Sequence, residues 1–229
     1  MNVTLIACTR AVDDINADPI RVVEEAASVC YDSKPTKSYR ITKACMASGH
    51  MSVLEHISFT FHVEGVSRAL LAQLSRHRHA SMSVRSQRYC KEDGFTFVDP
   101  FPNDTGDKGF TFRMSMLDQR SAYSQLLEAG ADPEDARMVL PNACCTELYI
   151  TANARALIEM SRLRLCTRAQ QEIREMFQAM RHEVAKVSPL VAEAMRPKCE
   201  MDPQHPFCTE RETCGRHPKL EDIYKPVEE

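Results

Sequence analysis

The chain lacks the features that mark membrane proteins and proteins that coat nucleic acid. Its 229 residues include only 7 glycines, with no internal repeat and no low-complexity segment. No apolar run approaches the roughly 18 residues that a membrane-spanning helix needs. The formal net charge of -3 gives no general excess of basic side chains to bind a phosphate backbone. We therefore expect a globular protein whose partners include neither a membrane nor a nucleic acid.

We expect no secretion signal at the start of this sequence. Residues 1–8 have no basic segment and too short an apolar run for one. The ten cysteines are therefore expected to be reduced thiols in the cytoplasm, where disulfides are rare. Most of them lie in or beside apolar segments, and we expect these to be small buried side chains.

The spacing of apolar residues predicts the secondary structure. Alternation predicts strands over residues 3–8, 57–64 and 95–98. Helical spacing predicts helices over residues 20–30, 38–48, 66–77, 113–129, 147–165 and 168–187. The strands come early and the helices late, which favours an α+β fold with a short twisted antiparallel sheet flanked by long helices.

Two of these helices carry more specific expectations. The helix over residues 20–30 is expected to bury one face that includes Ile20, Val23, Ala27 and Cys30. The next helix is expected to begin at Ser38 as its N-cap and to end before Gly49.

The most informative segment is residues 75–89, SRHRHASMSVRSQRY, with four arginines, two histidines and four serines. Guanidinium groups bind phosphate through paired donors, and serine hydroxyls and loop amides add neutral donors. For any single arginine the simpler interpretation is a solvated cation near a helix C-terminus. Four like charges within thirteen residues repel one another unless an anion neutralises them. The cluster therefore predicts a phosphorylated ligand.

A nucleotide fits this cluster better than a nucleic acid does. Tyr89 is the only aromatic residue of the segment that could stack on a base, and the chain is acidic overall. The alternative is a non-catalytic nucleic-acid-binding module that uses Arg76 to Arg88 as a phosphate rail. It predicts an affinity that falls steeply with salt.

Several motifs, in order, resemble those of the flavin-dependent thymidylate synthases. Arg76-His77-Arg78, seven residues, and Ser86-Gln87-Arg88 match the signature R-H-R-x7-S-x-R. Other segments resemble the family at residues 49–56 (GHMSVLEH), 136–141 (ARMVLP), 153–155 (NAR), 163–164 (LR) and 169–174 (AQQEIR). The resemblance spans residues 20–195. It implies an α+β homotetramer with FAD in each active site and with the active sites shared between chains.

The resemblance also implies a reaction and a site. The reaction is reductive methylation of dUMP to dTMP, with 5,10-methylenetetrahydrofolate as carbon donor and NADPH as reductant. The implied dUMP-binding residues are Gln73, Arg76, Arg85, Ser86, Gln87, Arg88, Arg137 and Arg164. Among these, Arg85 and Gln87 assist through their backbone amides, and Arg137 reaches the site from a neighbouring chain. The implied FAD-binding residues are Ser52, Arg76, His77, Arg78, His79, Asn153, Arg155 and Glu159. No metal ligand belongs to this site.

Arg164 resembles the arginine that lies against the uracil ring, which makes it the implied catalytic residue. Attack at C5 of uracil needs electron density pushed from N3 and O4, and a fixed cation there stabilises the developing charge. A guanidinium does this without titrating near neutral pH. Ser86 is then a ligand-binding hydroxyl rather than a nucleophile. For Glu159, an ordinary helix ion pair with Arg155 is the alternative.

One departure from the family affects the substrate. Ser83 and Val84 stand where the family commonly carries asparagine and glutamate, and loss of a carboxylate changes the local charge balance. This leaves open a flavin-dependent one-carbon modification of another pyrimidine nucleotide. Neither the order of substrate binding nor a preference between NADPH and NADH follows from the sequence.

A second departure is the tail. We expect the synthase domain to cover residues 1–195 and a Cys/His-containing tail to cover residues 196–229. Cys199, Cys208, Cys214 and His217 could hold zinc tetrahedrally. Their spacing lacks the close C-x2-C pair of strong zinc motifs, and several prolines favour a loosely ordered surface tail. Zinc is therefore the alternative in this segment.

Overall fold

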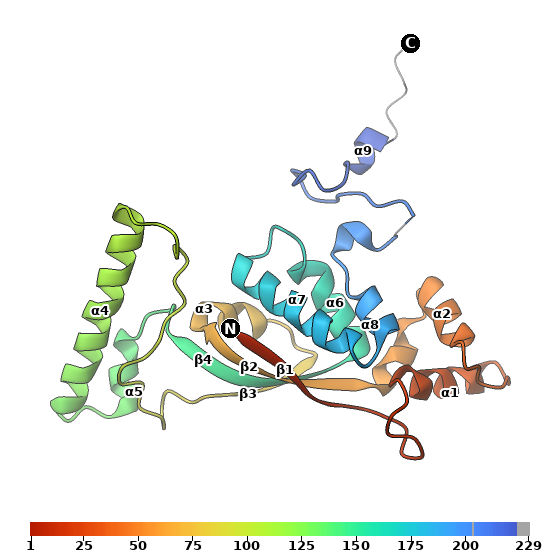
Figure 1. Ribbon diagram of the computed structural model, residues 1–229, viewed down its shortest axis with the longest axis horizontal. Helices are drawn as coiled ribbons and strands as arrows, with labels where there is room; N and C mark the ends of the chain where they lie inside the picture. The colour runs from red at the N-terminus through yellow and green to blue at the C-terminus, as the bar shows by residue number, and fades with distance from the viewer. Residues whose placement is uncertain (203, 224–229) are drawn as a thin grey trace, which may run out of the picture. The chain divides into compact units, whose positions relative to one another are not determined.

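The computed structural model describes residues 1–202 and 204–223 (Figure 1), so Pro203 and residues 224–229 of the expected tail lie outside the described residues. The strands are β1 (Asn2–Cys8), β2 (Ser58–Ser67), β3 (Ala80–Val84) and β4 (Cys145–Asn153). The α-helices are α1 (Ile20–Cys30), α2 (Arg40–Ala47), α3 (Arg68–Leu74), α4 (Asp107–Glu128), α5 (Pro133–Ala136), α6 (Ala154–Arg164), α7 (Gln171–Ala185), α8 (Pro189–Ala194) and α9 (Leu220–Ile223). The 3-10 helices are η1 (Met51–His56), η2 (Arg137–Val139) and η3 (Lys198–Glu200).

The four strands form one sheet in the order β1-β2-β4-β3. Its two central strands run antiparallel. Ala154 donates to the carbonyl of Ile57 at one end of the pair, and Arg68 donates to the carbonyl of Cys144 at the other. Between these ends the hydroxyls of Thr60 and Thr151 lie 2.9 Å apart. The mixed α+β class and the antiparallel sheet are confirmed.

The prediction of a helix over residues 147–165 is wrong in its first half, which is strand β4. Residues 145–153 alternate between buried and more accessible side chains, and Leu148, Ile150 and Ala152 are buried. That period of two belongs to a strand with one face against a core. Asn153 then ends the strand and caps α6, with Oδ1 accepting from the amide of Ala156 at 2.8 Å.

Two other extended segments also differ from expectation. Residues 80–84, expected in a loop, form the edge strand β3. Residues 95–98, expected as a strand, make only an isolated bridge between Phe97 and Cys144. The helix expected over residues 66–77 is shorter, because Val66 and Ser67 still belong to β2 and α3 ends at Leu74.

The chain divides into two compact units. Unit 1 contains residues 1–2, 62–78 and 82–150, and unit 2 contains residues 3–61, 79–81 and 151–229. Within unit 2, α7 lies beside α6 and α8 (Figure 1). As predicted, α7 buries a stripe of Ile173, Met176, Phe177, Met180 and Val184. The boundary expected at residue 195 stays a prediction.

The corner between α1 and α2 in unit 2 is organised by a buried carboxylate. Helix α1 has the expected bounds, but Cys30 is exposed and Glu24 is 1% exposed. The carboxylate of Glu24 accepts hydrogen bonds from the amide and hydroxyl of Thr42, both at 2.8 Å. It also accepts from the hydroxyl of Thr36 at 2.7 Å and the amide of Ile41 at 3.2 Å.

The N-terminus of helix α2 is therefore capped by the side chain of Glu24 and not by Ser38. The carboxylate supplies acceptors to the first amides of α2, which have no partner within the helix. Burial alone would raise the pKa of Glu24, but the hydrogen bonds from Thr42 and Thr36 outweigh it and lower that pKa to about 2. Gly49 has φ +80 after the end of α2, which confirms the expected terminating glycine.

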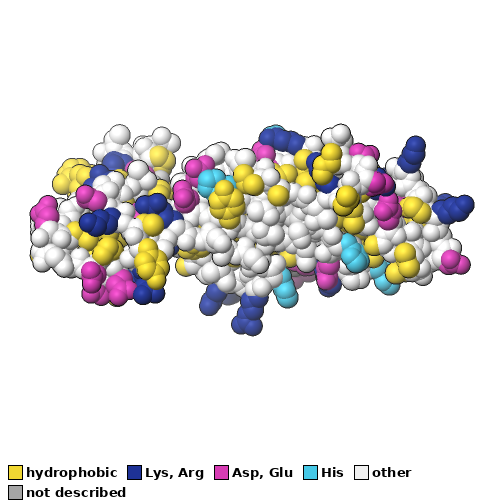
Figure 2. Space-filling model, turned by 90° about the horizontal axis from the view of Figure 1, so that it is seen from below, with side chains coloured by type: hydrophobic (Ala, Val, Ile, Leu, Met, Phe, Trp, Pro, Cys, Tyr) yellow, Lys and Arg dark blue, Asp and Glu magenta, His cyan; other side chains and the backbone are white. Residues whose placement is uncertain are grey.

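Helix α4 in unit 1 starts earlier than the sequence predicts and carries an exposed apolar stripe. Arg113 holds the preceding loop, with Nη1 at 3.0 Å from Asp99 and Nη2 at 2.7 Å from the carbonyl of Asp104. Phe110, Met114 and Leu117 recur on one face of α4 and are all exposed. Figure 2 shows exposed hydrophobic side chains lying among charged ones. Among the described residues, no helix has the length and apolarity to cross a membrane.

Candidate functional site

The arginine loop, residues 76–88, begins where α3 ends. Ser67 starts α3 by accepting from the amide of Leu70 at 3.0 Å. Arg76 and Arg78, after the end of this helix, are exposed. Neither forms an ion pair with any residue in the part of the chain that the structure describes. The loop thus presents two cations that none of the described residues neutralises.

Arg85, by contrast, is held by the protein on three sides. Its amide donates to the carbonyl of Glu147 at 3.0 Å, and its own carbonyl accepts from Arg68 at 2.8 Å. Its Nε lies 3.1 Å from Oε1 of the buried Glu92, which raises the pKa of Arg85. The amide of Arg85, expected to assist nucleotide binding, is therefore already used by the protein. Arg85 fixes the start of the turn that follows β3.

Three of the predicted nucleotide-binding residues lie together at the end of the loop, two of them bound to Glu134 and the third to Arg88. Arg88 Nε lies 2.8 Å from the Glu134 carboxylate, and Arg137 Nε donates to the Glu134 carbonyl at 3.1 Å. The hydroxyl of Ser86 accepts from the amide of Arg88 at 3.2 Å. Ser86, Arg88 and Arg137 therefore come together within unit 1 of a single chain. That a neighbouring chain supplies Arg137 stays a prediction.

The ion pair between Arg88 and Glu134 is weak enough for another anion to replace Glu134. Its side chains are 52% and 48% exposed, and exposed pairs of this kind contribute only about 0–1 kcal/mol. A phosphate offers more acceptors and more charge to the same guanidinium than one carboxylate does. The geometry therefore allows an incoming phosphate to replace Glu134 as the partner of Arg88.

Gln87 faces the protein interior. Its amide nitrogen lies 3.8 Å from the sulfur of buried Cys144, whose pKa burial raises to about 11. The Gln87 side chain is thus used to pack the turn, which leaves its backbone amide as the group expected to assist a ligand. Gln73 lies in the last turn of α3 and is half-buried.

A second group of predicted residues gathers in unit 2, where η1 packs against the start of α6. Arg155 Nη1 lies 2.6 Å from Glu55 of η1, and Asn153 caps the helix. Ser52, also in η1, is exposed. The first amides of a helix and its dipole favour an anion at this end. This group therefore offers a cation, two polar side chains and a helix N-terminus.

The alternative interpretation of Arg155 and Glu159 as an ion pair is wrong. Arg155 pairs with Glu55, whereas Glu159 pairs with Arg162 at 2.9 Å. Arg155 lies in the first turn of α6, beside η1, where Glu55 is within reach. A spacing of four residues on a helix allows an ion pair but does not exclude a better partner elsewhere.

Arg164 is the last residue of α6 and is half-buried in unit 2. Burial lowers the pKa of its guanidinium, which nevertheless stays charged at any physiological pH. Its place at the C-terminal end of the helix also favours a cation. Of the two histidines of the arginine loop, His77 is half-buried in unit 1 and His79 is exposed in unit 2.

Comparison with known proteins decides what this pattern belongs to. The sequence model of a family described as thymidylate synthase complementing protein matches residues 11–190. The chain belongs to this family. Its relatives include flavin-dependent thymidylate synthases of Clostridium tetani, 37% identical over 90% of this chain and 93% of that protein, and of Geobacter sulfurreducens, 39% identical over 91% and 94%. Another, from Nitratidesulfovibrio vulgaris, is 42% identical over 76% of this chain and 74% of that protein.

The family match covers both groups of site residues but ends before the cysteines of the tail. All residues from Ser52 to Arg164 lie within residues 11–190, and Cys199 lies beyond them. Sequence analysis missed the acidic partners Glu92 and Glu134. Nothing in the local sequence distinguishes them, because each is recognised only by the arginine that the fold brings to it.

Proposed function

We propose that this protein methylates dUMP to dTMP, with FAD as cofactor, 5,10-methylenetetrahydrofolate as carbon donor and NADPH as reductant. Membership of the thymidylate synthase complementing protein family supports the reaction, as do relatives named flavin-dependent thymidylate synthase. One observation carries the nucleotide assignment: Arg88 pairs with the exposed, replaceable carboxylate of Glu134, and Arg137 and Ser86 lie beside this pair. Arg137 binds the backbone carbonyl of Glu134, and the Ser86 hydroxyl binds the amide of Arg88.

In this proposal the phosphate of dUMP displaces Glu134 from Arg88. Arg88 and Arg137 then hold the phosphate as charged donors, and Ser86 adds a hydroxyl. The contacts from Arg85 to Glu92 and Arg68 keep the turn in place, so little ordering is needed on binding. Gln73 and Arg76 complete the nucleotide-binding set.

The residues assigned to FAD are Ser52, Arg76, His77, Arg78, His79, Asn153, Arg155 and Glu159. Their donor chemistry fits a dinucleotide with a pyrophosphate. Arg76 and Arg78 have no carboxylate partner among the described residues, and Arg155 lies at a helix N-terminus. When bound, reduced FAD supplies the hydride that completes the methyl group, and NADPH restores it.

Arg164 is the proposed catalytic residue. Held at the end of α6, its guanidinium would face N3 and O4 of the uracil and stabilise negative charge there as C5 attacks the one-carbon unit. Partial burial strengthens this effect because less water competes for the charge. The protein contributes binding, orientation and electrostatics, and no covalent bond between a side chain and the substrate is required.

The proposal includes a cytoplasmic homotetramer. The stripe of Phe110, Met114 and Leu117 on α4 would gain by burial against a second copy of the chain. The ten cysteines are all free thiols, which suits a reducing compartment. Light scattering of the purified protein measures the assembly directly.

The test begins with an absorbance spectrum of the purified protein and a titration of the flavin band with dUMP. Turnover is then measured with dUMP, dCMP and UMP, which separates thymidylate synthesis from modification of another pyrimidine nucleotide. A colourless protein that takes up no FAD and binds RNA or DNA in a strongly salt-dependent way would instead be a nucleic-acid-binding module.

A further inference from the structure

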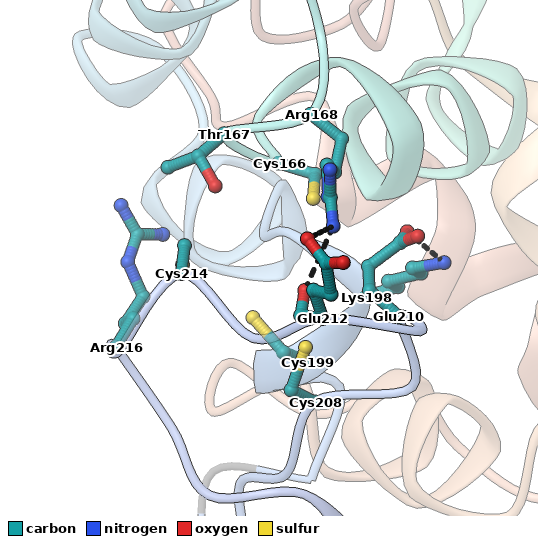
Figure 3. Close-up of a pocket in the computed structure, with 10 residues that line it drawn as sticks. All are labelled: Cys166, Thr167, Arg168, Lys198, Cys199, Cys208, Glu210, Glu212, Cys214 and Arg216. Atoms are coloured by element: carbon teal, nitrogen blue, oxygen red, sulfur yellow. Dashed lines mark hydrogen bonds and ion pairs between the residues drawn. The ribbon is translucent and has the colours of Figure 1, made fainter.

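Four cysteines line one small cavity in unit 2, and none of them is among the residues assigned to dUMP or FAD. Cys166 comes from the turn between α6 and α7, and Cys199, Cys208 and Cys214 come from the tail. Figure 3 shows the sulfur atoms of Cys166, Cys199 and Cys208 directed toward this cavity. Sequence spacing grouped the three tail cysteines with His217 and left out Cys166, which is 33 residues before Cys199.

The size of the cavity restricts what it can hold. Its volume is about 20 Å³, whereas roughly 10–15 Å³ on the same measure suffices for a single water molecule. A monatomic ion fits this space, and an organic cofactor does not. The occupant must therefore be identified by the chemistry of the surrounding side chains.

The formal charges around the cavity are already paired with one another. Lys198 lies 2.5 Å from Glu210, Arg168 lies 3.6 Å from Glu212, and Arg216 lies 3.3 Å from Glu200. The carboxylates are thus already ion-paired, which leaves the four neutral thiols as the groups of metal-ligand type in the cavity that have no ion-pair partner. Thiolates are soft ligands that select zinc over calcium or magnesium.

The tail is held in a defined conformation by its own backbone. The amide of Phe207 donates to the carbonyl of Cys199 at 3.1 Å, and the amide of Cys208 donates to the carbonyl of Pro218 at 2.7 Å. Cys214 of the tail and Thr167 of the turn that carries Cys166 both line the cavity, which places the tail beside that turn. The described part of the tail is therefore more ordered than the prolines of its sequence suggest.

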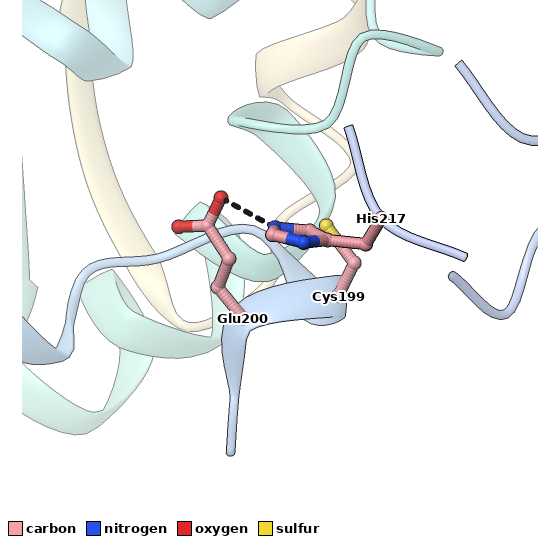
Figure 4. Close-up of side chains that lie close together, drawn as sticks. All are labelled: Cys199, Glu200 and His217. Atoms are coloured by element: carbon pink, nitrogen blue, oxygen red, sulfur yellow. Dashed lines mark hydrogen bonds and ion pairs between the residues drawn. The ribbon is translucent and has the colours of Figure 1, made fainter. Parts of the chain in front are cut away.

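A further potential ligand lies beside Cys199. The ligand atoms of Cys199, Glu200 and His217 lie within 4.8 Å of one another. In Figure 4 the imidazole of His217 faces the carboxylate of Glu200, with 3.3 Å between Nε2 and Oε1. His217 is engaged by Glu200 and does not line the cavity, so the ligands offered by the cavity are the four cysteines. Their sulfur atoms, unlike the ligand atoms of Cys199, Glu200 and His217, do not lie within 4.8 Å of one another, so the side chains must turn inward to bind one ion.

We propose that Cys166, Cys199, Cys208 and Cys214 bind one zinc ion through four thiolates. Each thiol releases its proton to solvent as its bond to the metal forms, and no oxidation takes place. Lys198, Arg168 and Arg216 surround the cavity and offset part of the negative charge of a four-thiolate zinc centre. The metal would fasten the tail to the turn that begins two residues after Arg164.

The test measures metal in the full-length, FAD-loaded protein by plasma mass spectrometry, as purified and after zinc is added and the excess removed. We expect one zinc per chain in the wild type. Cys166→Ser and Cys208→Ser should each lose most of the zinc. Cys30→Ser, which changes an exposed cysteine at the end of α1, should keep it.

A second measurement needs no substitution and covers the case in which the serine variants do not fold. Cobalt(II) added to the chelator-treated wild type should produce intense thiolate-to-metal charge-transfer bands and tetrahedral d–d bands. A chelator should lower the melting temperature of the wild type, and added zinc should restore it.

Three results would overturn the zinc site. The wild type could bind no zinc under either condition, Cys166→Ser could retain a full equivalent, or intact mass could show the cysteines paired as disulfides in fresh protein. Metal content is read without turnover, so this outcome and that of the dUMP assay are independent.

Discussion

The α1–α2 corner and the arginine loop both collect charged and polar groups, but they satisfy them differently. In the corner, Glu24 is buried and its carboxylate accepts hydrogen bonds from amides and hydroxyls of the same chain. In the loop, Arg76 and Arg78 form no ion pair with the described residues, and Arg88 is held by a carboxylate that is itself half exposed. The corner is complete within the protein. The loop still has positively charged side chains that can bind an anionic ligand.

This difference separates residues that stabilise the fold from residues that bind a ligand. Removing a fully partnered buried group leaves unsatisfied donors and lowers stability. Removing an exposed cation with no protein partner changes the folded protein little and costs ligand binding instead. The predictions below test this division from the largest expected effect to the smallest.

Glu24→Gln should give the largest loss of stability. The shift of the Glu24 pKa from 4.5 to about 2 corresponds to roughly 3 kcal/mol at neutral pH. The melting temperature should therefore fall by roughly 6–12 °C. Because the folded-state pKa is depressed, this stabilisation is present above about pH 4.5 and is lost as the pH falls toward 2. Calorimetry across that range measures it.

Glu25→Gln provides the matched control for Glu24. Glu25 is the exposed neighbour on α1 and pairs with Arg21 across one helical turn at 2.8 Å. We expect a change below about 0.5 kcal/mol. Equal destabilisation by the two substitutions would contradict a special role for the buried carboxylate.

Arg88→Ala should give the largest loss of substrate binding. Loss of a charge-assisted phosphate contact costs about 2–3 kcal/mol, or roughly 30- to 150-fold in the dUMP dissociation constant. Arg88→Lys should recover part of this loss, since it keeps the charge but not the paired donors. Titration of the flavin band with dUMP measures both variants. Arg40→Ala, at an exposed arginine on α2, should bind dUMP normally.

Arg76→Ala should weaken FAD binding by about tenfold, because a charged hydrogen bond to a phosphate is lost. Its melting temperature without FAD should equal that of the wild type, because Arg76 forms no ion pair within the described chain. Equilibrium dialysis gives the FAD affinity, and calorimetry gives the stability. A marked fall in apoprotein stability would show that Arg76 has a structural partner after all.

Glu134→Gln should produce the smallest effect, and it should be a gain. Without its negative charge, residue 134 competes less with phosphate for Arg88, and dUMP should bind about two- to fivefold more tightly. Asp135→Asn removes the neighbouring exposed acidic charge and should change the affinity less. Weaker binding by Glu134→Gln would mean that Glu134 positions Arg88 rather than competing for it.

Local patterns predicted much of the fold. The α1 bounds, the buried stripe of α7 and the strand around Phe59 and Phe61 follow from apolar spacing alone. Strand β4 was missed although Thr146, Tyr149 and Ile150 favour a strand, because the helical spacing of α6 was extended back through it. Cys30 was assigned to the buried face by its helical spacing, but it is the last residue of α1 and is exposed. The buried carboxylate of Glu24 was missed because a hydrophobic pattern does not reveal a buried charge.

The candidate site was predictable as a set of residues but not as a set of contacts. The arginines and serines appear as a motif because they are close in sequence. Their protein partners do not, since Arg155 and Glu55 are 100 residues apart and Arg88 and Glu134 are 46 apart. Only the folded chain shows which cations are already paired.

Asn153 constrains how this protein can vary in length. It is the last residue of β4 and the cap of α6, so sheet and helix share one junction with no loop between them. Inserting a residue there must either move the strand register or turn the side chains of α6 by about 100°. Either change would redirect Arg155 and Arg164 together. Homologous chains should therefore differ in length at loops such as residues 101–106, and keep the distance from β4 to Arg164 constant.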